Sequence, residues 1–248
     1  MRSIALQRPS ASAGLWLALL FAFLLLDMHR LEPLFAYAFP RVEPEIFDRA
    51  TFLELFISHL ALVAAASGAA AAVGIGLAVL VTRPAGQDFR TTVTIAVTIG
   101  QTFPPAAVLA LAVPALGFGP RPTAVALFLY GLLPIVENTI AGIENVPEAV
   151  RDAAAGVGLK PWQVLRDVEL PLAAPVILAG VRVSVTIAIG TATIGSAVGA
   201  LTFGTPIFDG LAANKLPYVI QGAVLVALFA ILTDLLFARL ARWLQPPG

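Results

Sequence analysis

The sequence predicts an all-α protein that lies in a membrane as a bundle of about six transmembrane helices. Of the 248 residues, 59% are hydrophobic and 12% are charged, whereas soluble domains are about half apolar and a quarter charged. Several apolar runs approach the roughly 20 residues that a helix needs to cross a hydrocarbon core. The runs are continuous in Ala, Leu, Val and Ile instead of alternating with polar residues, which favours helices over a β-barrel.

The composition also excludes several classes of function. The formal net charge is zero, so there is no basic surface for nucleic acid. There is no cysteine, and the two histidines, His29 and His59, are too few for a metal centre; we expect His59 to reach the membrane interface. The sequence has no P-loop motif and no cluster of a nucleophile with an acid or base. We therefore expect a chain that is not an enzyme and binds no metal or cofactor itself.

The first span is expected at Ala13–Leu26. A cleaved signal peptide is the alternative, because Ala36-Tyr37-Ala38 has the small-x-small form of a cleavage site. That site lies about ten residues beyond the apolar run, so we predict an uncleaved helix. A charged loop at 27–55 follows it.

Five further spans are expected. The second, Phe56–Val81, is rich in alanine and glycine, which predicts close packing against other helices. The third, Thr92–Leu116, contains Pro104-Pro105. Two prolines break the hydrogen-bond ladder, so this helix should be kinked or interrupted. The others are Thr123–Ile143, a span from Leu172 through Gly199, and Leu216–Leu240.

A polar segment at 144–172 separates the fourth and fifth spans. Pro147 suits the start of a short helix, and Gly158 suits a left-handed stop. Pro161 then opens a second short helix, which we expect to end before Pro171. A compact pair of helices in the loop of a membrane protein indicates a docking surface for a soluble partner.

The loop also carries a specific pattern. It consists of Asp152-Ala153-Ala154, then three residues and Gly158, then nine residues and Val168-Glu169-Leu170-Pro171. This pattern resembles the EAA loop of permeases in binding-protein-dependent ABC importers. The family pattern has Glu and Ile where this chain has Asp152 and Val168, and the spacing is the same. In that family the loop helix inserts into a groove on the ATP-hydrolysing subunit. The resemblance therefore implies these ATPase-coupling residues: Asp152, Ala153, Ala154, Gly158, Val168, Leu170 and Pro171.

The resemblance implies a type I ABC importer permease fold in the bacterial cytoplasmic (inner) membrane. The expected partners are an ABC ATP-binding subunit, which uses the ATP, an extracytoplasmic solute-binding protein and a second permease subunit, identical or related. The expected division is an N-terminal transmembrane helix with an outer loop (1–55), a permease core (56–240) containing the coupling loop 144–172, and a cytoplasmic tail (241–248).

Three further segments look like the permeases of osmoprotectant importers: Leu133–Ile143, Ala174–Arg182 and Ile189–Gly199. The function expected from this resemblance is a path for glycine betaine, choline or a related quaternary amine. The alternatives are a permease for methionine or another amino acid, and a membrane scaffold that transports nothing. Glu137 stands where such permeases commonly have arginine, and Gly199–Gly204 departs from their glycine-rich run. The solute therefore stays open.

The distribution of Lys and Arg predicts the orientation. With the N-terminus inside, nine of the fifteen fall in cytoplasmic segments: Arg2, Arg8, Arg83, Arg90, Arg151, Lys160, Arg166, Arg239 and Arg242. Five fall in outer segments: Arg30, Arg41, Arg49, Arg121 and Lys215. Both termini and the 144–172 loop are then cytoplasmic.

Three ionisable residues fall inside apolar spans, where facing lipid would cost several kcal/mol each. At 1.5 Å per residue, Arg182 lies roughly 15 Å from Leu172 and Glu137 roughly 10 Å from Glu144, so an ion pair between them is predicted. Either this pair is structural or one of its members lines the path. The third residue, Asp234, is expected to be solvated or capping. The weaker pathway candidates are Gln101, Asn138, Thr191 and Thr193.

Overall fold

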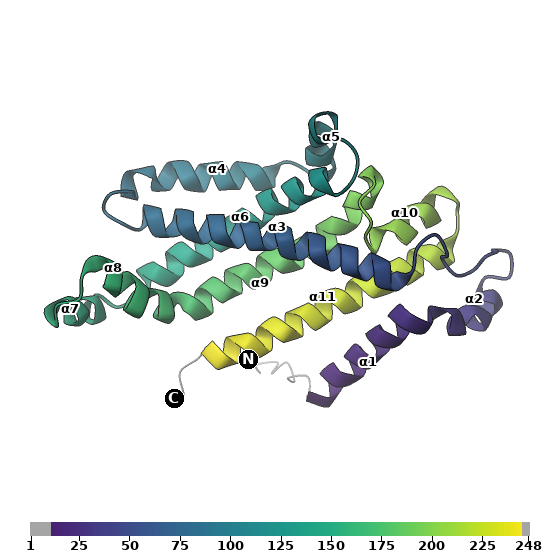
Figure 1. The fold of residues 1–248 in the computed structure, drawn as a ribbon, viewed down its shortest axis with the longest axis horizontal. Coiled ribbons are helices and arrows are strands. Elements are labelled where there is room, and N and C mark those ends of the chain that lie inside the picture. Colours follow the sequence, from purple (N-terminus) through teal and green to yellow (C-terminus); the bar gives the residue numbers. More distant parts are fainter. Residues whose placement is uncertain (1–10, 245–248) are drawn as a thin grey trace, which may run out of the picture.

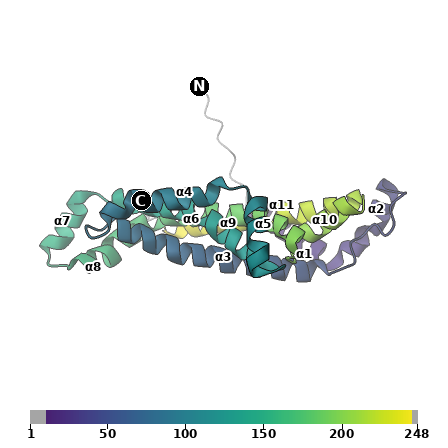
Figure 2. The ribbon, with the colours of Figure 1, turned by 90° about the horizontal axis from the view of Figure 1, so that it is seen from above.

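The computed structural model describes residues 11–244, and no β-strand occurs in that range. Figures 1 and 2 show a flattened, elongated bundle whose long helices lie roughly side by side. Five of its helices are long and apolar enough to cross a membrane, or six if one bent pair counts as a span. The predicted fold class is therefore confirmed. Arg2, Arg8 and the last part of the predicted tail, 245–248, lie outside the described residues.

The N-terminal span is longer than expected. Helix α1 (Ala11–Asp27) passes through the 3₁₀ turn η1 (Met28–Leu31) into α2 (Glu32–Ala38). The charged loop predicted from residue 27 is thus helical over its first part. Pro33 permits this because it lies in the first turn of α2, where its missing N–H would have no helical acceptor.

The remaining part of the predicted charged loop, up to Thr51, is hydrogen-bonded to the C-terminal half of the chain. The buried amide of Gln221 accepts a hydrogen bond from Phe47 N at 3.0 Å and donates one to Glu45 O at 2.7 Å. Lys215 Nζ donates to Glu43 O at 2.7 Å. Because Gln221 satisfies two backbone groups, this loop has a defined position on the bundle.

Helix α3 (Phe52–Val81) begins with a capping box. Glu54 N donates to Thr51 Oγ1 at 3.2 Å, and Thr51 N donates to Glu54 Oε2 at 2.9 Å. These two bonds satisfy backbone donors that the first turn leaves free, so the start of α3 lies at Phe52.

The predicted break at Pro104-Pro105 is confirmed. The 3₁₀ turn η2 (Gln87–Phe89) leads into α4 (Arg90–Thr102), and α5 (Pro105–Leu116) follows. The two parts of this span meet at 94°, and Figure 1 shows α5 standing across the end of α4.

Helix α6 (Pro120–Glu144) lies at the centre and packs against α3 and against α9 (Leu170–Ile194). Glycines let these backbones approach closely. A Cβ added to Gly180 of α9 would lie 2.6 Å from Pro134 O and 2.7 Å from Asn138 Cβ on α6. Even alanine at position 180 would therefore force the two helices apart.

After α9, a 3₁₀ turn η4 (Gly195–Val198) and an unpredicted short helix, α10 (Gly204–Ala212), precede α11 (Leu216–Leu244). Hydroxyl groups hold this turn. Ser196 Oγ and Thr202 Oγ1 are 2.8 Å apart, and Thr202 Oγ1 also accepts from Gly204 N at 3.0 Å.

His59 is fully buried in α3, so the expectation that it reaches the interface is wrong. Its Nε2 lies 3.2 Å from Ile189 O, and Phe203 N donates to its Nδ1 at 3.3 Å. Both ring nitrogens therefore have partners inside the bundle. The surrounding aromatic cluster consists of Phe21, Phe56, Phe203 and Phe229.

Candidate functional site

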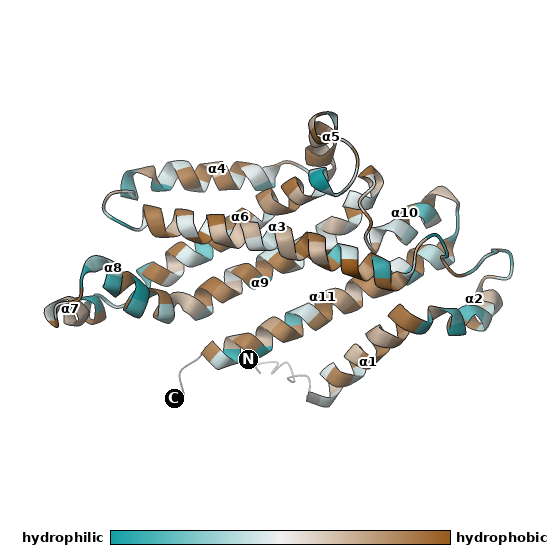
Figure 3. Ribbon diagram, in the orientation of Figure 1, coloured by the Kyte–Doolittle hydropathy of each residue, from teal (hydrophilic) through white to brown (hydrophobic). Residues whose placement is uncertain are grey.

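The 144–172 loop forms a projection at one end of the bundle (Figure 1). It contains α7 (Glu148–Gly156), α8 (Pro161–Val164) and the π-helix η3 (Leu165–Glu169). Figure 3 shows hydrophilic segments gathered there, whereas the long helices are mainly hydrophobic. We call this end of the molecule the loop end.

The left-handed conformation predicted for Gly158 is confirmed by its φ of +89°. Its N–H donates to Ala155 O at 2.9 Å, and Leu159 N donates to Ala154 O at 3.2 Å. These bonds satisfy carbonyls at the end of α7 and turn the chain towards α8.

The second loop helix does not end before Pro171, so that expectation is wrong. Residues 161–198 form one helical stretch, and Pro171 lies in the first turn of α9. A proline within an α-helix clashes with the carbonyl four residues earlier. The wider π-turn at η3, with Leu170 N bonded to Leu165 O, changes the hydrogen-bond register just before the proline.

The coupling residues inferred from the resemblance differ in exposure. Asp152, Ala153, Gly158 and Pro171 are exposed, Val168 and Leu170 are half-buried, and Ala154 is buried. Two large apolar side chains that sequence reasoning missed, Val157 and Trp162, are 80% and 55% exposed on the same loop. Their occurrence as apolar residues in a polar segment could have identified them from the sequence. Together they make a surface suited to a protein partner.

Ion pairs connect several elements at the loop end. Arg90 at the start of α4 pairs with Glu144 at the end of α6, with Nη2 2.9 Å from Oε2. Glu169 pairs with Arg83, which follows α3, at 2.7 Å and lies 3.7 Å from Arg151 of α7. Sequence reasoning passed over Glu169 because it occupies the variable position of the loop pattern.

The predicted ion pair between Glu137 and Arg182 is not formed. Arg182 instead binds Asp234 of α11 with both Nε and Nη2, each 2.6 Å from a carboxylate oxygen. Asp234, which we expected to be solvated or capping, is 42% exposed, but it caps no helix end and forms this ion pair instead. Asn138, next to Glu137, packs against Gly180, so the predicted similarity in depth is right. The two side chains leave their helices in different directions.

Glu137 is exposed on α6, as is Ala141 one turn later. It has no ion pair with any of residues 11–244. The Asn138 side chain has a structural bond instead, because its Nδ2 donates to Pro134 O at 2.7 Å.

Gln101 has a backbone partner as well. Pro134 has no N–H, which leaves Tyr130 O without its usual helical donor. Gln101 Nε2 of α4 donates to that oxygen at 2.6 Å. Thr193 donates to Gly190 O of its own helix at 2.6 Å, and Thr191 is half-buried on the same helix.

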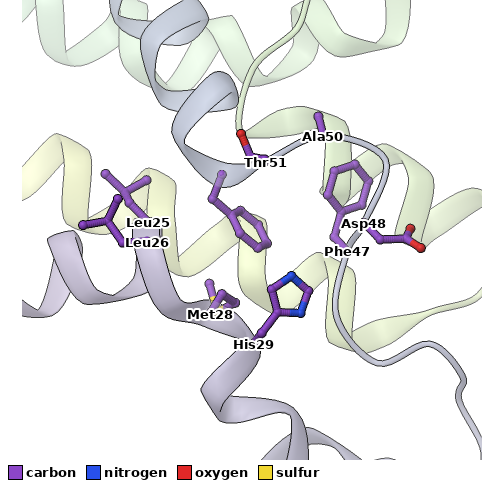
Figure 4. A pocket seen from close by; sticks show the side chains of 9 residues that line it. Leu25, Leu26, Met28, His29, Phe47, Asp48, Ala50 and Thr51 are labelled. Carbon is purple, nitrogen blue, oxygen red and sulfur yellow. The ribbon is translucent and has the colours of Figure 1, made fainter.

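A small pocket of about 170 Å³ lies at the opposite end of the molecule, between the end of α1 and the start of α3. Figure 4 shows Leu25, Leu26 and Met28 on one side of it and Phe47 and Asp48 on the other. Its volume is below the roughly 300–1,000 Å³ of typical ligand sites. None of the predicted pathway residues lines it.

Comparison with known proteins identifies the family. The model for the inner membrane component of binding-protein-dependent transport systems matches residues 70–246. The chain belongs to this family. The permease is 46% identical over 188 residues to the osmoprotectant import permease protein OsmY of Salmonella typhimurium, covering 76% of this chain and 80% of the relative. It is 45% identical over 152 residues to the choline transport system permease protein OpuBB of Bacillus subtilis, covering 61% and 70% respectively.

The fold of the permease has a solved counterpart. The inward-facing MetNI methionine ABC transporter superposes with a TM-score of 0.70 at 21% identity, covering 78% of this chain and 96% of that one. This confirms the predicted ABC importer permease fold. The family consists of transport subunits of ATP-driven, binding-protein-dependent importers in the bacterial inner membrane. An ATPase and a solute-binding protein are therefore its implied partners, and the permease is not an enzyme.

Proposed function

We propose that this permease forms part of the path by which a bacterial ABC importer takes up a quaternary-amine osmoprotectant such as glycine betaine or choline. The names of its relatives support this solute class. The structural observation that carries the proposal is the unpaired carboxylate of Glu137, which is exposed on α6.

Glu137 supports a path between two permease subunits. A carboxylate that faces lipid in the middle of a span costs several kcal/mol, so such groups face protein or water instead. A second permease subunit, identical or related, would cover this face of α6 and enclose a wet space along it. Gln101, Asn138, Thr191 and Thr193 remain the weaker pathway candidates, because three of them already donate to backbone oxygens.

The charges near Glu137 favour a cationic solute. Arg182 lies at a similar depth and would repel a methylammonium group if it were free, but Asp234 neutralises it through two hydrogen bonds. Glu137 then supplies a net negative potential, which attracts cations within about a Debye length.

The proposed orientation places the loop end in the cytoplasm together with both termini. Segments assigned to one side from their charges do meet at one end: Arg83 and Arg151 approach Glu169, and Arg90 pairs with Glu144. We further propose that the coupling residues, Asp152 to Pro171, bind the ATPase. The division into 1–55, 56–240 and 241–248 stays a proposal, with the core beginning near Phe52.

Solute-stimulated ATP hydrolysis tests the proposal. The permease would be purified with its ATPase and binding protein in lipid nanodiscs, and hydrolysis measured with glycine betaine, choline or methionine. We expect stimulation by the quaternary amines, reduced roughly tenfold at low solute concentration in Glu137→Gln because the attraction is lost. Glu32→Gln on α2 is the matched control. Stimulation by methionine alone would reject the solute class, and a normal response of Glu137→Gln would reject the role of Glu137.

A further inference from the structure

Glu169 is a buried carboxylate held between two arginines from two other elements. Only 2% of its side chain is exposed. Arg83 Nη1 lies 2.7 Å from Glu169 Oε2, and Arg151 Nη1 lies 3.7 Å from Glu169 Oε1. A carboxylate removed from water needs such partners to stay charged. The three residues therefore form a single charged contact, which we call the Glu169 cluster.

The cluster joins three elements at the loop end. Glu169 is the last residue of η3 and directly precedes α9. Arg83 follows Thr82, which caps the C-terminus of α3. Arg151 lies within α7, directly before Asp152. The loop helix, the second span and the fifth span thus meet at one carboxylate.

Two other ion pairs at this end differ from it. Arg166 and Asp167 are adjacent in η3 and are 72% and 49% exposed, so they connect no separate elements. Arg90 and Glu144 connect α4 to α6 but are 47% and 45% exposed. Exposed pairs of this kind are screened and individually weak. In the Glu169 cluster the arginines are 29% and 36% exposed, but the carboxylate is buried. Separation therefore leaves the Glu169 charge unpaired in a low dielectric, which makes this contact harder to break.

The π-turn adds an independent observation. Single π-turns within α-helices occur frequently at functional sites. Here the π-turn lets the helix pass from α8 into α9 without a break at Pro171 and ends at Glu169. A displacement of α7 can therefore reach α9 through the cluster as well as along the chain.

We propose that Glu169 is a positioning residue that makes α7, the end of α3 and the start of α9 move as one body when the ATPase displaces α7. This inference rests on the proposed function, since it takes the ATPase to bind α7. Without the cluster, α7 would follow the ATPase while α3 stayed behind. ATP would then be hydrolysed without a matching opening of the path.

The first test compares two arginines at the same end. Arg83→Gln removes the half-buried partner that lies 2.7 Å from Glu169, and Arg90→Gln removes an exposed partner of Glu144. In proteoliposomes that hold the complete importer, we expect solute uptake per ATP hydrolysed to fall at least about fivefold in Arg83→Gln and to stay near wild type in Arg90→Gln. Arg83→Lys, which keeps the charge, should recover most of the ratio. Equal ratios in Arg83→Gln and wild type would overturn the proposal.

Arg151→Gln decides the matter if Arg83→Gln does not assemble. It leaves the pair of Arg83 and Glu169 in place, and it should also lower uptake per ATP; an unchanged ratio would overturn the proposal.

A measurement without solute separates this proposal from the proposed function. Because the chain has no cysteine, spin labels can be attached at Ala155→Cys on α7 and Ala85→Cys after α3. In the wild-type background their distance should stay constant when ATP is trapped, whereas in Glu169→Gln it should change. An unchanged distance in Glu169→Gln would overturn the proposal even if the importer carried a different solute.

Discussion

Gly158 has a backbone conformation that residues with a side chain reach only at a cost of about 1–2 kcal/mol. Gly156, two residues earlier, also has open space around a Cβ, but its φ is not positive. We predict that Gly158→Val inserts into the membrane normally yet loses ATPase binding and transport, because the turn between α7 and α8 shifts. Co-purification with the ATPase measures this. Gly156→Val is the matched control, and equal binding by the two variants would contradict the role of the turn.

The ion pair of Arg182 and Asp234 should contribute to the stability of the protein. Removing one partner leaves the other without its charged hydrogen bonds, which costs about 1–3 kcal/mol. We expect Arg182→Gln and Asp234→Asn each to lower the melting temperature in detergent, and the double variant to lose less than the sum of both.

Glu137→Gln is the control for this comparison of single and double variants. Because Glu137 does not bind Arg182, combining Glu137→Gln with Arg182→Gln should give additive losses of stability. Additive losses for Arg182 with Asp234, or strong coupling of Arg182 with Glu137, would contradict the pairing in the structure.

Residue positions within the membrane were predictable in depth but not in direction. The rise of 1.5 Å per residue places Glu137 and Arg182 at similar depths, and the contact of Asn138 with Gly180 bears this out. The rotation of one helix relative to another depends on packing across the whole bundle. Asp234 and Glu137 were both possible partners for Arg182, and the sequence alone does not show which of the two carboxylates faces it.

At the scale of helices, the bond from Gln101 to Tyr130 O links α4 to α6 at a proline. We predict that Gln101→Leu destabilises the protein by about 1–3 kcal/mol, because the buried carbonyl loses its donor. In a Pro134→Ala background, residue 134 regains an N–H for that carbonyl, so the same change should cost much less. Melting temperatures of the four variants measure the difference. Equal costs in both backgrounds would contradict this account of Gln101.

The prolines show which helix breaks could be predicted from the local sequence. At Pro104-Pro105 the backbone of Phe103 and Pro104 is extended, so α4 ends before the two prolines and α5 begins at Pro105. Pro171 does not interrupt its helix, because η3 precedes it, and a π-turn has no residue signature that distinguishes it from an α-turn. Helix α10 was missed because the Thr202 hydroxyl and its neighbours, which form on folding, hold its start.

At the scale of the whole molecule, the two ends should face different compartments. A cysteine introduced at Lys160, on the loop, should react with impermeant thiol reagents only from the cytoplasmic side, and one at Glu43 only from outside. The chain contains no cysteine that would add background. Labelling of both positions from the same side, or in the reverse pattern, would contradict the proposed orientation.

The family was predictable from the loop because its residues are contiguous and their spacing is fixed by two short helices. The face of the molecule that we propose meets a second permease was not predictable, because the sequence alone does not show that Glu137 is exposed. The exposed fraction of that side chain became visible only once α6 was placed among α3, α4, α5 and α9.

Uptake into proteoliposomes tests the central claim most directly. The permease, its ATPase and its binding protein would be reconstituted with ATP on the side of the loop, and entry of labelled glycine betaine and choline followed. We predict ATP-dependent accumulation of at least one of them, abolished in Gly158→Val and weakened in Glu137→Gln. Accumulation of neither solute by a complex that assembles and hydrolyses ATP, or accumulation that is independent of ATP, would contradict the account.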